Sequence, residues 1–279
     1  MKEKTFAREG YLRENYRLFH LRDTAGQERD FHFHDFDKLV ILLSGRVDYT
    51  VENETWSLRP WDVLLVKHHT IHRALIDRNL PYERIILYLD GRYLERLLPE
   101  AELTGCFDRS EHQRQHLFTP DEEERENLRS CLADLEKAMT DEQFGAGALR
   151  DACLVRLMVA VNRLVRRSEA MPERESAVYD PKVARALSYI NENLGRDISV
   201  DEIAEKAYLS KYYFMRLFKA QTGSSVHAYV RQKRLMNAAR LIREGMSVGH
   251  AAAESGFKDY SSFYRAFRET FGVSPGEMK

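Results

Sequence analysis

The sequence predicts a multi-domain α+β protein, with an N-terminal β-barrel, a helical dimerisation segment, and a C-terminal all-α domain of two helix-turn-helix units joined by a long helix. Three patterns support this prediction. Short β-branched and aromatic runs fill residues 1–100, two leucine-striped helical patterns follow, and an internal repeat occupies the C-terminal part. The expected units are the barrel (1–118), the helical segment (119–168), a linker (169–180) and the helical domain (181–279).

Composition places the chain among globular proteins. Its 279 residues include 43 Lys+Arg, 44 Asp+Glu and 43% hydrophobic residues, which excludes disordered and fibrous classes. The longest apolar runs are far shorter than the ~20 residues of a membrane span. The N-terminus carries charges where a signal peptide is apolar, so we expect a cytoplasmic protein without a membrane partner. Cys106, Cys131 and Cys153 lack CxxC spacing and fit reduced thiols.

Residues 1–100 have the pattern of a small β-barrel or sandwich. Short runs rich in valine, isoleucine and aromatic residues are separated by breaks at Ser44-Gly45, Glu52-Asn53-Glu54 and Pro60. Strands of this length and spacing are typical of closed or two-sheet β architectures.

After Pro120 the hydrophobic period changes to that of helices. The first pattern opens with acidic residues, and the second spans Leu149–Arg167. Their apolar stripes are Leu128, Leu132, Leu135 and Met139 in the first, and Leu154, Leu157, Val161 and Leu164 in the second. We expect these stripes to form the seam of a homodimer; the alternative is that they pack on their own barrel.

These helices are separated from the C-terminal part by a polar stretch with two prolines, Ser168–Pro181. Its composition predicts a linker. The charge also changes there. Residues 180–279 hold 16 lysines and arginines against 11 aspartates and glutamates, a charge of +5, whereas residues 1–179 carry −6. A basic module behind an acidic body favours a polyanionic partner for the C-terminal domain.

An internal repeat with an offset of 49 residues is the most informative pattern. The matching pairs are Ala204 and Ala253, Phe214 and Phe263, Arg216 and Arg265, Phe218 and Phe267, Lys219 and Arg268, Gly223 and Gly272, and Ser225 and Ser274. Each unit, about 198–223 and 247–272, predicts a short helix, a tight turn and a second helix closed by glycine. This is the pattern of a helix-turn-helix, present twice.

Each second helix predicts a buried phenylalanine pair and an opposite, exposed face. The exposed residues are Lys211, Tyr212, Tyr213, Arg216 and Lys219 in the first unit, and Tyr260, Ser261, Tyr264, Arg265 and Arg268 in the second. Arginine can fork onto guanine in a major groove, and tyrosine or serine can contact phosphates and base edges. The alternative is that these residues form a basic face that contacts only solvent. Two homologous helices with arginine at the matching place favour binding to double-stranded DNA.

Between the units, Val226–Glu244 predicts a long amphipathic helix. Its expected inward residues are Tyr229, Leu235, Ala238, Leu241 and Ile242, and its outward residues are Arg231, Lys233 and Arg240. Such a helix can hold the two recognition helices about 34 Å apart, the separation of successive major-groove faces on one side of a duplex. We therefore expect sequence-selective binding to tandem half-sites.

Residues 181–279 resemble the DNA-binding domain of the AraC/XylS family of bacterial transcription regulators. The resemblance rests on residues 198–242 and 256–275, with the Gly-x-Ser that ends each unit and Tyr229 and Arg234 after the first. Ala251-Ala252 replaces the Ile-Ala pair that the family favours. The resemblance implies a ligand-responsive regulator, with activation, contact with RNA polymerase and control of carbohydrate or small-metabolite genes as common themes.

The barrel region contains a cluster of histidines. Five of the ten lie between His32 and His72, and the spacing Gly26-x5-His32-x-His34-x3-Lys38-x6-Gly45 resembles the first motif of the cupin barrels. Metal-binding cupins place a glutamate where Lys38 stands, and a lysine cation there would repel the ion. We therefore expect no metal or other cofactor. The predicted small-molecule effector site consists of His32, His34, Lys38 and His72.

Three other interpretations of these features stay open. In the first, the imidazoles serve only internal hydrogen bonds. In the second, the chain is a metal-dependent cupin enzyme with a regulatory DNA-binding tail. In the third, the basic domain binds DNA without sequence preference. No GxSxG, HExxH, CxxC or glycine-rich phosphate loop is present, so we expect no enzyme. His112 and His116 have metal-ligand spacing, but their polar surroundings predict a surface position.

Overall fold

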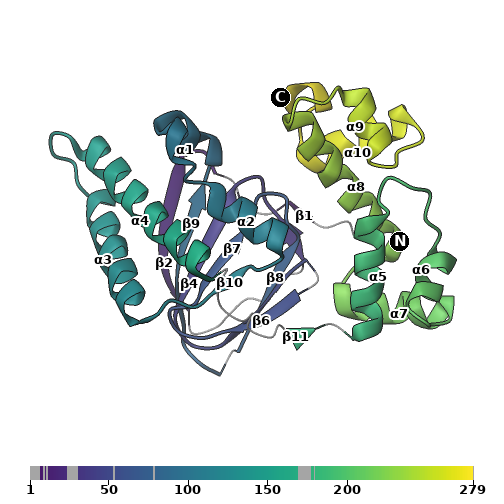
Figure 1. Ribbon diagram of the computed structural model, residues 1–279, viewed down its shortest axis with the longest axis horizontal. Coiled ribbons are helices and arrows are strands. Elements are labelled where there is room, and N and C mark those ends of the chain that lie inside the picture. Colours follow the sequence, from purple (N-terminus) through teal and green to yellow (C-terminus); the bar gives the residue numbers. More distant parts are fainter. Residues whose placement is uncertain are drawn as a thin grey trace.

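The computed structural model describes residues 7–8, 10, 12–23, 31–52, 54–77, 79–168, 177–178 and 180–278. A sheet-rich N-terminal domain and a helical C-terminal domain lie side by side (Figure 1). Gly26 of the cupin-like motif and most of the expected linker fall outside the described residues. Within the described part, no helix combines the length and apolar character needed to cross a bilayer.

Two sheets make up the barrel. The first contains, in spatial order, β1 (Ala7–Arg8), β3 (His32–Phe33), β8 (His72–Ile76), β5 (Val47–Val51), β6 (Glu54–Leu58) and β11 (Ala177–Val178). The second contains β10 (Leu117–Phe118), β7 (Val63–Val66), β4 (Asp37–Ser44), β9 (Tyr82–Leu89) and β2 (Tyr16–Asp23). The pairings are antiparallel except that of β1 with β3.

Strand β4 is covered on both faces, which explains its unbroken apolar run. Val40 and Leu42 join the core between the two sheets, whereas Leu39 and Ile41 join a second core under helices. Side chains alternate between the faces of a strand, so Lys38 lies on the same face as Val40. The lysine is thereby placed in the barrel interior.

Helices cover the outer face of the second sheet. They are α1 (Gly91–Leu97), the short 3₁₀ helix η1 (Pro99–Ala101), α2 (Gly105–Gln113), α3 (Glu122–Met139) and α4 (Ala146–Ser168). Helices α3 and α4 confirm the two striped patterns, and α3 begins with a capping box between Asp121 and Glu124. The leucine stripes of both helices are buried in the apolar core that the two helices share with this sheet. The prediction that the stripes form a dimer seam is therefore wrong, because their apolar area is already covered by their own domain.

The C-terminal domain consists of helices throughout its described part. They are α5 (Pro181–Glu192), α6 (Val200–Lys206), α7 (Lys211–Thr222), α8 (Val226–Arg243), α9 (Val248–Glu254), α10 (Tyr260–Phe271) and the 3₁₀ helix η2 (Pro275–Met278). The pairs α6–α7 and α9–α10 are the two expected helix-turn-helix units. Gly223 and Gly272 end the second helices with φ of 71° and 75°, a conformation that glycine adopts without steric penalty.

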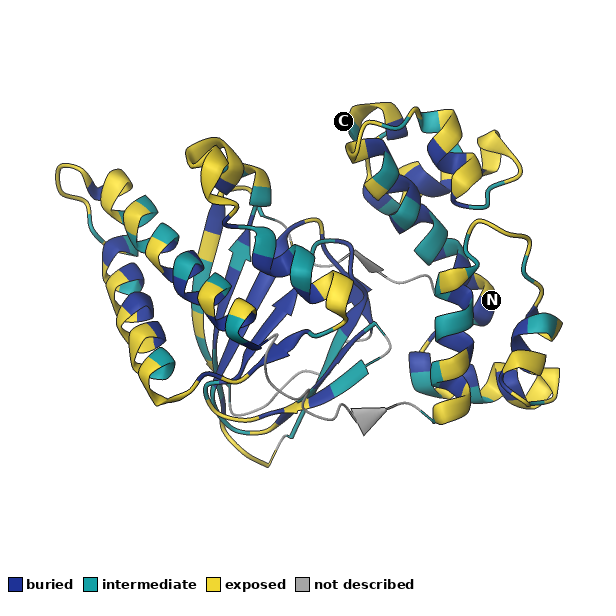
Figure 2. Cartoon of the chain, in the orientation of Figure 1, coloured by how far each residue is buried: buried dark blue, intermediate teal, exposed yellow. Residues whose placement is uncertain are grey.

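The two domains contact each other through a shared apolar cluster. Phe31, Phe33 and Ile71 of the barrel belong to the core that holds the C-terminal helices together, and the rings of Phe33 and Phe271 lie 6.1 Å apart. Strand β11, which falls within the expected linker 169–180, pairs with β6 of the barrel. Figure 2 shows the buried residues gathered on the inner faces of sheets and helices in each domain.

Candidate nucleic-acid interface and effector site

The first helix-turn-helix unit presents α7 on the outside of the domain. Ser199 caps α6 by accepting a hydrogen bond from the Glu202 N–H at 3.1 Å. The turn contains Tyr208 at φ 55°, a left-handed conformation uncommon for non-glycine residues. Phe214 and Phe218 are fully buried and fix the inner face of α7. The opposite face is therefore directed away from the core.

The predicted residues of α7 all lie on that outer face. Lys211, Tyr212, Tyr213, Arg216 and Lys219 are exposed, and Tyr212 retains 80% of its accessible surface. The Arg216 guanidinium lies 5.4 Å from the centre of the Tyr213 ring. Lys211 forms a surface ion pair with Asp201 at 2.7 Å, a type of contact worth about 0–1 kcal/mol that a DNA phosphate can replace.

The second unit repeats this arrangement on α10. Asp259 caps the helix by accepting from the Ser262 N–H at 2.6 Å, and hydrogen bonding from Ser262 lowers the pKa of this carboxyl. Tyr260, Ser261, Arg265 and Arg268 are exposed, and Tyr264 is half-buried with its ring 6.3 Å from that of Tyr260. The inner phenylalanines are again fully buried.

Helix α8 fixes the two units relative to each other. Its predicted inward residues are buried, except Leu241, which is partly buried. Arg234 donates to the carbonyl oxygens of Leu194 and Arg196 at 3.0 and 2.6 Å, which ties α8 to the segment after α5. Arg231 pairs with Glu269 of α10 at 3.1 Å. The recognition helices are thus held on one rigid frame.

The predicted effector residues meet inside the barrel. The His72 ring lies 4.3 Å from that of His32 and 4.7 Å from that of His34, and the Lys38 Nζ donates to the Tyr49 hydroxyl at 2.7 Å. His32, His34, Lys38 and His72 are all buried. The structure therefore brings together four residues that the sequence spreads over three strands and a loop.

The hydrogen bonds of this cluster assign the tautomers of two imidazoles. The Nδ1 of His34 lies 2.6 Å from the Phe36 carbonyl oxygen, and the Nδ1 of His72 lies 2.9 Å from that of Thr70. A carbonyl oxygen can only accept, so both Nδ1 atoms carry the proton and both Nε2 atoms are acceptors. Both Nε2 atoms are buried without a hydrogen-bond partner. Burial, and then the Lys38 cation, lower the pKa of both imidazoles well below 6.5.

The histidines do not form a metal centre in this arrangement. No group of three or more His, Cys, Asp or Glu side chains among the described residues has metal-binding geometry. His112 is exposed as expected, but the surface position predicted for His116 is wrong. His116 is buried, its Nδ1 lies 3.1 Å from the Leu65 carbonyl oxygen, and its ring packs against Trp56.

Two family models match the chain. The AraC-like ligand binding domain matches residues 16–158, and the helix-turn-helix domain matches residues 203–279. The chain belongs to the AraC family of transcription regulators. An AraC family protein with both domains is a ligand-responsive, sequence-specific DNA-binding regulator, in agreement with the function predicted from the sequence.

This AraC family protein is similar to individual curated proteins and to solved structures. The HTH-type transcriptional activator RhaR of Pectobacterium atrosepticum is 27% identical over 255 residues, covering 89% of this chain and 85% of that protein. The regulatory protein PocR of Salmonella typhimurium is 36% identical over 98 residues, covering 35% of this chain and 32% of that protein. Wild-type ToxT from Vibrio cholerae superposes with a TM-score of 0.39 at 13% identity, covering 95% of this chain and 96% of that one.

Sequence reasoning missed several residues that shape the sites of this AraC family protein. Tyr208, in the first turn, is 77% exposed, and the Arg185 guanidinium of α5 lies 4.8 Å from its ring centre. Lys233, expected only to point outward, forms an ion pair with Glu52 of the barrel at 2.7 Å. Tyr208 could have been recognised from the sequence, because it lies next to a basic helix. The Lys233–Glu52 pair could not, because two residues so far apart in the sequence leave no periodic pattern.

Proposed function

We propose that this regulator reads two adjacent half-sites of promoter DNA with α7 and α10, and that a small molecule bound in the barrel controls this binding. The proposal keeps the units predicted from the sequence: a sensor in 1–118, a helical segment in 119–168, a linker in 169–180 and the DNA-binding domain in 181–279. The observation that carries the proposal is the pair of homologous, exposed faces held on one frame by α8.

The residues proposed to contact DNA divide into two roles. Arg216 and Arg265 occupy matching places in the middle of the recognition helices, where a guanidinium can bond guanine O6 and N7. The flanking tyrosines, lysines and serine, together with Arg268, contact phosphates or base edges and fix the register. They are Lys211, Tyr212, Tyr213, Lys219, Tyr260, Ser261, Tyr264 and Arg268.

The proposed effector site is the barrel cluster. The two unpartnered Nε2 acceptors of His34 and His72 invite hydroxyl donors, since a buried polar atom without a partner costs about 1–3 kcal/mol. Lys38 offers a cation and donor beside them, and His32 completes the wall. A small hydroxyl-rich molecule, with an oxygen directed at Lys38, fits this set of donors and acceptors. No catalytic role is proposed for the cluster.

A loop connects the effector cluster to the DNA-binding domain. The N–H of His69, between β7 and β8, donates to the carbonyl oxygen of His34 at 2.7 Å. The same residue's ring lies 3.0 Å from a guanidinium nitrogen of Arg243, the last residue of α8. An effector that shifts the histidines would therefore shift the end of the helix that carries both units, and so change the population of DNA-binding conformations.

Dimerisation and activation complete the proposal. Phe144, at the tip of the α3–α4 hairpin, is fully exposed, and Leu149 is 49% exposed nearby. Exposed apolar side chains on one surface are typical of an interaction site, so we assign the outer surface of the hairpin, rather than its leucine stripes, to a homodimer. The relative RhaR is a transcriptional activator, which supports activation through RNA polymerase for this chain.

Substitution of the two central arginines tests DNA reading. A duplex site is first selected from random DNA with the full-length protein, and every single-base variant of it is then measured with Arg216→Ala and Arg265→Ala. Each variant should lose about 1–3 kcal/mol of discrimination at one base position, and the two positions should differ. Arg163→Ala, on the exposed side of α4, is the matched control. An equal loss of affinity for all DNA sequences would show that both arginines contact phosphates and not bases.

A further inference from the structure

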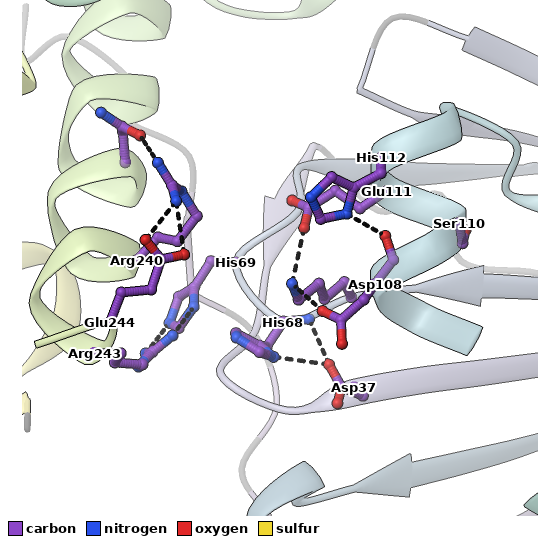
Figure 3. A network of polar contacts seen from close by, with 12 residues as sticks. Asp37, His68, His69, Asp108, Ser110, Glu111, His112, Arg240, Arg243 and Glu244 are labelled. Atoms are coloured by element: carbon purple, nitrogen blue, oxygen red, sulfur yellow. Dashed lines mark hydrogen bonds and ion pairs between the residues drawn. The ribbon is translucent and has the colours of Figure 1, made fainter. Parts of the chain in front are cut away.

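A cavity of about 380 Å³ lies between the two domains, separate from the barrel cluster. This volume is within the range of small-molecule sites, ~300–1,000 Å³. The barrel contributes Lys67, His69 and Arg114 to its wall, and the DNA-binding domain contributes Asn191, Lys233 and Arg243. Figure 3 shows part of this boundary, with α8 facing the β7–β8 loop and α2.

The charges on the wall are unequal. Five lysines and arginines line the cavity, against three glutamates. Lys67 lies 3.0 Å from Glu111, and Lys233 lies 2.7 Å from Glu52. Burial opposes the charged form of Lys67, but Glu111 and Asp108 outweigh it and raise the pKa of this lysine. Lys67 therefore stays protonated. The excess of positive charge favours an anionic occupant.

Among the described residues, Arg243 has no carboxylate within ion-pair distance, whereas Lys67, Lys233 and Arg240 of the same wall each pair with one. Its guanidinium nitrogens lie 3.0 and 3.2 Å from the two ring nitrogens of His69, and one of them lies 3.2 Å from the Met278 sulfur. A neutral imidazole has a single accepting nitrogen, so at most one of the two contacts with His69 is a hydrogen bond. Desolvation by burial, and then the charge of Arg92, lower the pKa of Arg243, and the more distant charges of Asp35 and Asp37 offset this only in part. An anion next to this guanidinium would supply the missing acceptors.

We propose that the interdomain cavity binds a small, hydroxyl-bearing anion, such as a sugar phosphate or a sugar acid. Its charged group pairs with Arg243, and its hydroxyl groups face the amide and hydroxyl side chains of Ser188, Asn191 and Asn237. This site is additional to the effector site proposed in the barrel and does not depend on it.

Occupancy of this cavity would hold the sensor against α8. The ligand contacts the β7–β8 loop on one side and α5 and α8 on the other, so it stabilises one relative placement of the domains. Because α8 joins the two recognition helices, the bound anion and DNA become coupled, and each changes the affinity of the other by the same factor.

Calorimetric titration of the full-length protein at constant ionic strength tests the proposal. The probes are glucose 6-phosphate, glucuronate, inorganic phosphate and the neutral sugar glucose. We expect saturable binding of at least one anionic sugar and none of glucose. The comparison of glucose 6-phosphate with glucuronate separates phosphate from carboxylate recognition. Equal binding of glucose and the anions, or no saturable binding of any anion, overturns the proposal.

Variants locate the binding. Arg243→Met should weaken the anion by about tenfold or more, whereas Arg243→Lys should retain part of it. Arg240→Met is the matched control, because this arginine lines the same cavity from the same helix but is already held by Glu244 at 2.6 Å. Lys38→Met alters the proposed effector site and leaves every residue of the cavity wall in place, so it distinguishes binding in the barrel from binding in the cavity. If Arg243→Met binds as the wild type does, or if Lys38→Met alone abolishes binding, the cavity is not the site.

Discussion

The barrel cluster and the recognition helices hold their functional side chains in opposite ways. In the barrel, His34 and His72 are buried and each leaves one nitrogen without a partner. On the recognition helices, Arg216 and Arg265 are exposed to solvent above a cluster of buried apolar residues. A small ligand can form hydrogen bonds with buried groups that water does not reach. A DNA duplex is instead contacted by exposed groups, which form hydrogen bonds with water before the DNA binds. Changes in the barrel should therefore affect stability and pH dependence, and changes on the recognition faces should affect DNA binding with little effect on stability.

The largest effect is expected from the core under the recognition faces. Phe218 and Phe267 are fully buried, and replacing either by alanine should lower the free energy of unfolding by about 3–5 kcal/mol. Denaturant unfolding of the full chain, followed by helical circular dichroism, measures the change. Tyr212→Ala, on the exposed face of the same helix as Phe218, should stay within about 0.5 kcal/mol. Equal losses in the core and surface variants would break the comparison.

Acid should destabilise the barrel more than the helical domain. The folded barrel keeps His34 and His72 neutral, with pKa values well below 6.5, but in the unfolded chain both take up protons near that value. The unfolded state then binds more protons, so stability is complete above pH about 6.5 and falls as the pH falls toward the lowered values. Two such imidazoles should remove about 2–3 kcal/mol within one pH unit below that point.

Tryptophan fluorescence isolates this acid effect, because Trp56 and Trp61 both lie in the barrel domain and are the two tryptophans of the chain. In the double variant His34→Gln, His72→Gln, the unfolding of the barrel should depend less on pH than in the wild type. The same slope in the variant and the wild type would assign the acid sensitivity to other groups.

A smaller effect is expected from Lys38→Met. Removing the cation should raise the pKa of His34 and His72 toward the ordinary value, which NMR titration of the ring protons measures. Stability should change by about 1 kcal/mol or less, because the lost hydrogen bond to Tyr49 is offset by the removal of a buried charge. The affinity for DNA without effector should stay the same. Unmoved imidazole titrations, or weaker DNA binding, would show that the two regions are not separable in this way.

The sequence allowed the helical domain to be predicted closely, and the sensor less so. Helices α6 to α10 follow from a repeat, caps and closing glycines, which are local signals, and the predicted long helix Val226–Glu244 agrees with α8 within one residue. The short helices α1 and α2 were missed because their apolar positions are few. The leucine stripes of α3 and α4 were ambiguous, since periodicity shows that a face is buried and does not show against what.

Contacts between the domains could not be predicted. The pairs Lys233–Glu52 and Arg243–His69 join residues 181 and 174 positions apart. Charged residues on an exposed-looking helix face have the same pattern whether they meet solvent, DNA or another domain. The histidine cluster was predictable because its members share strand faces and loop ends of a recognisable barrel motif.

Reading of DNA by both recognition helices is tested by selection of bound fragments from genomic DNA with the purified full-length protein, followed by a salt titration of the best fragment. We expect enriched sites with two half-sites about 10 bp apart, centre to centre, and affinity that falls steeply with salt as several phosphate contacts are lost. Enrichment of single half-sites, or equal affinity for bulk DNA, would contradict a reading of DNA by both recognition helices.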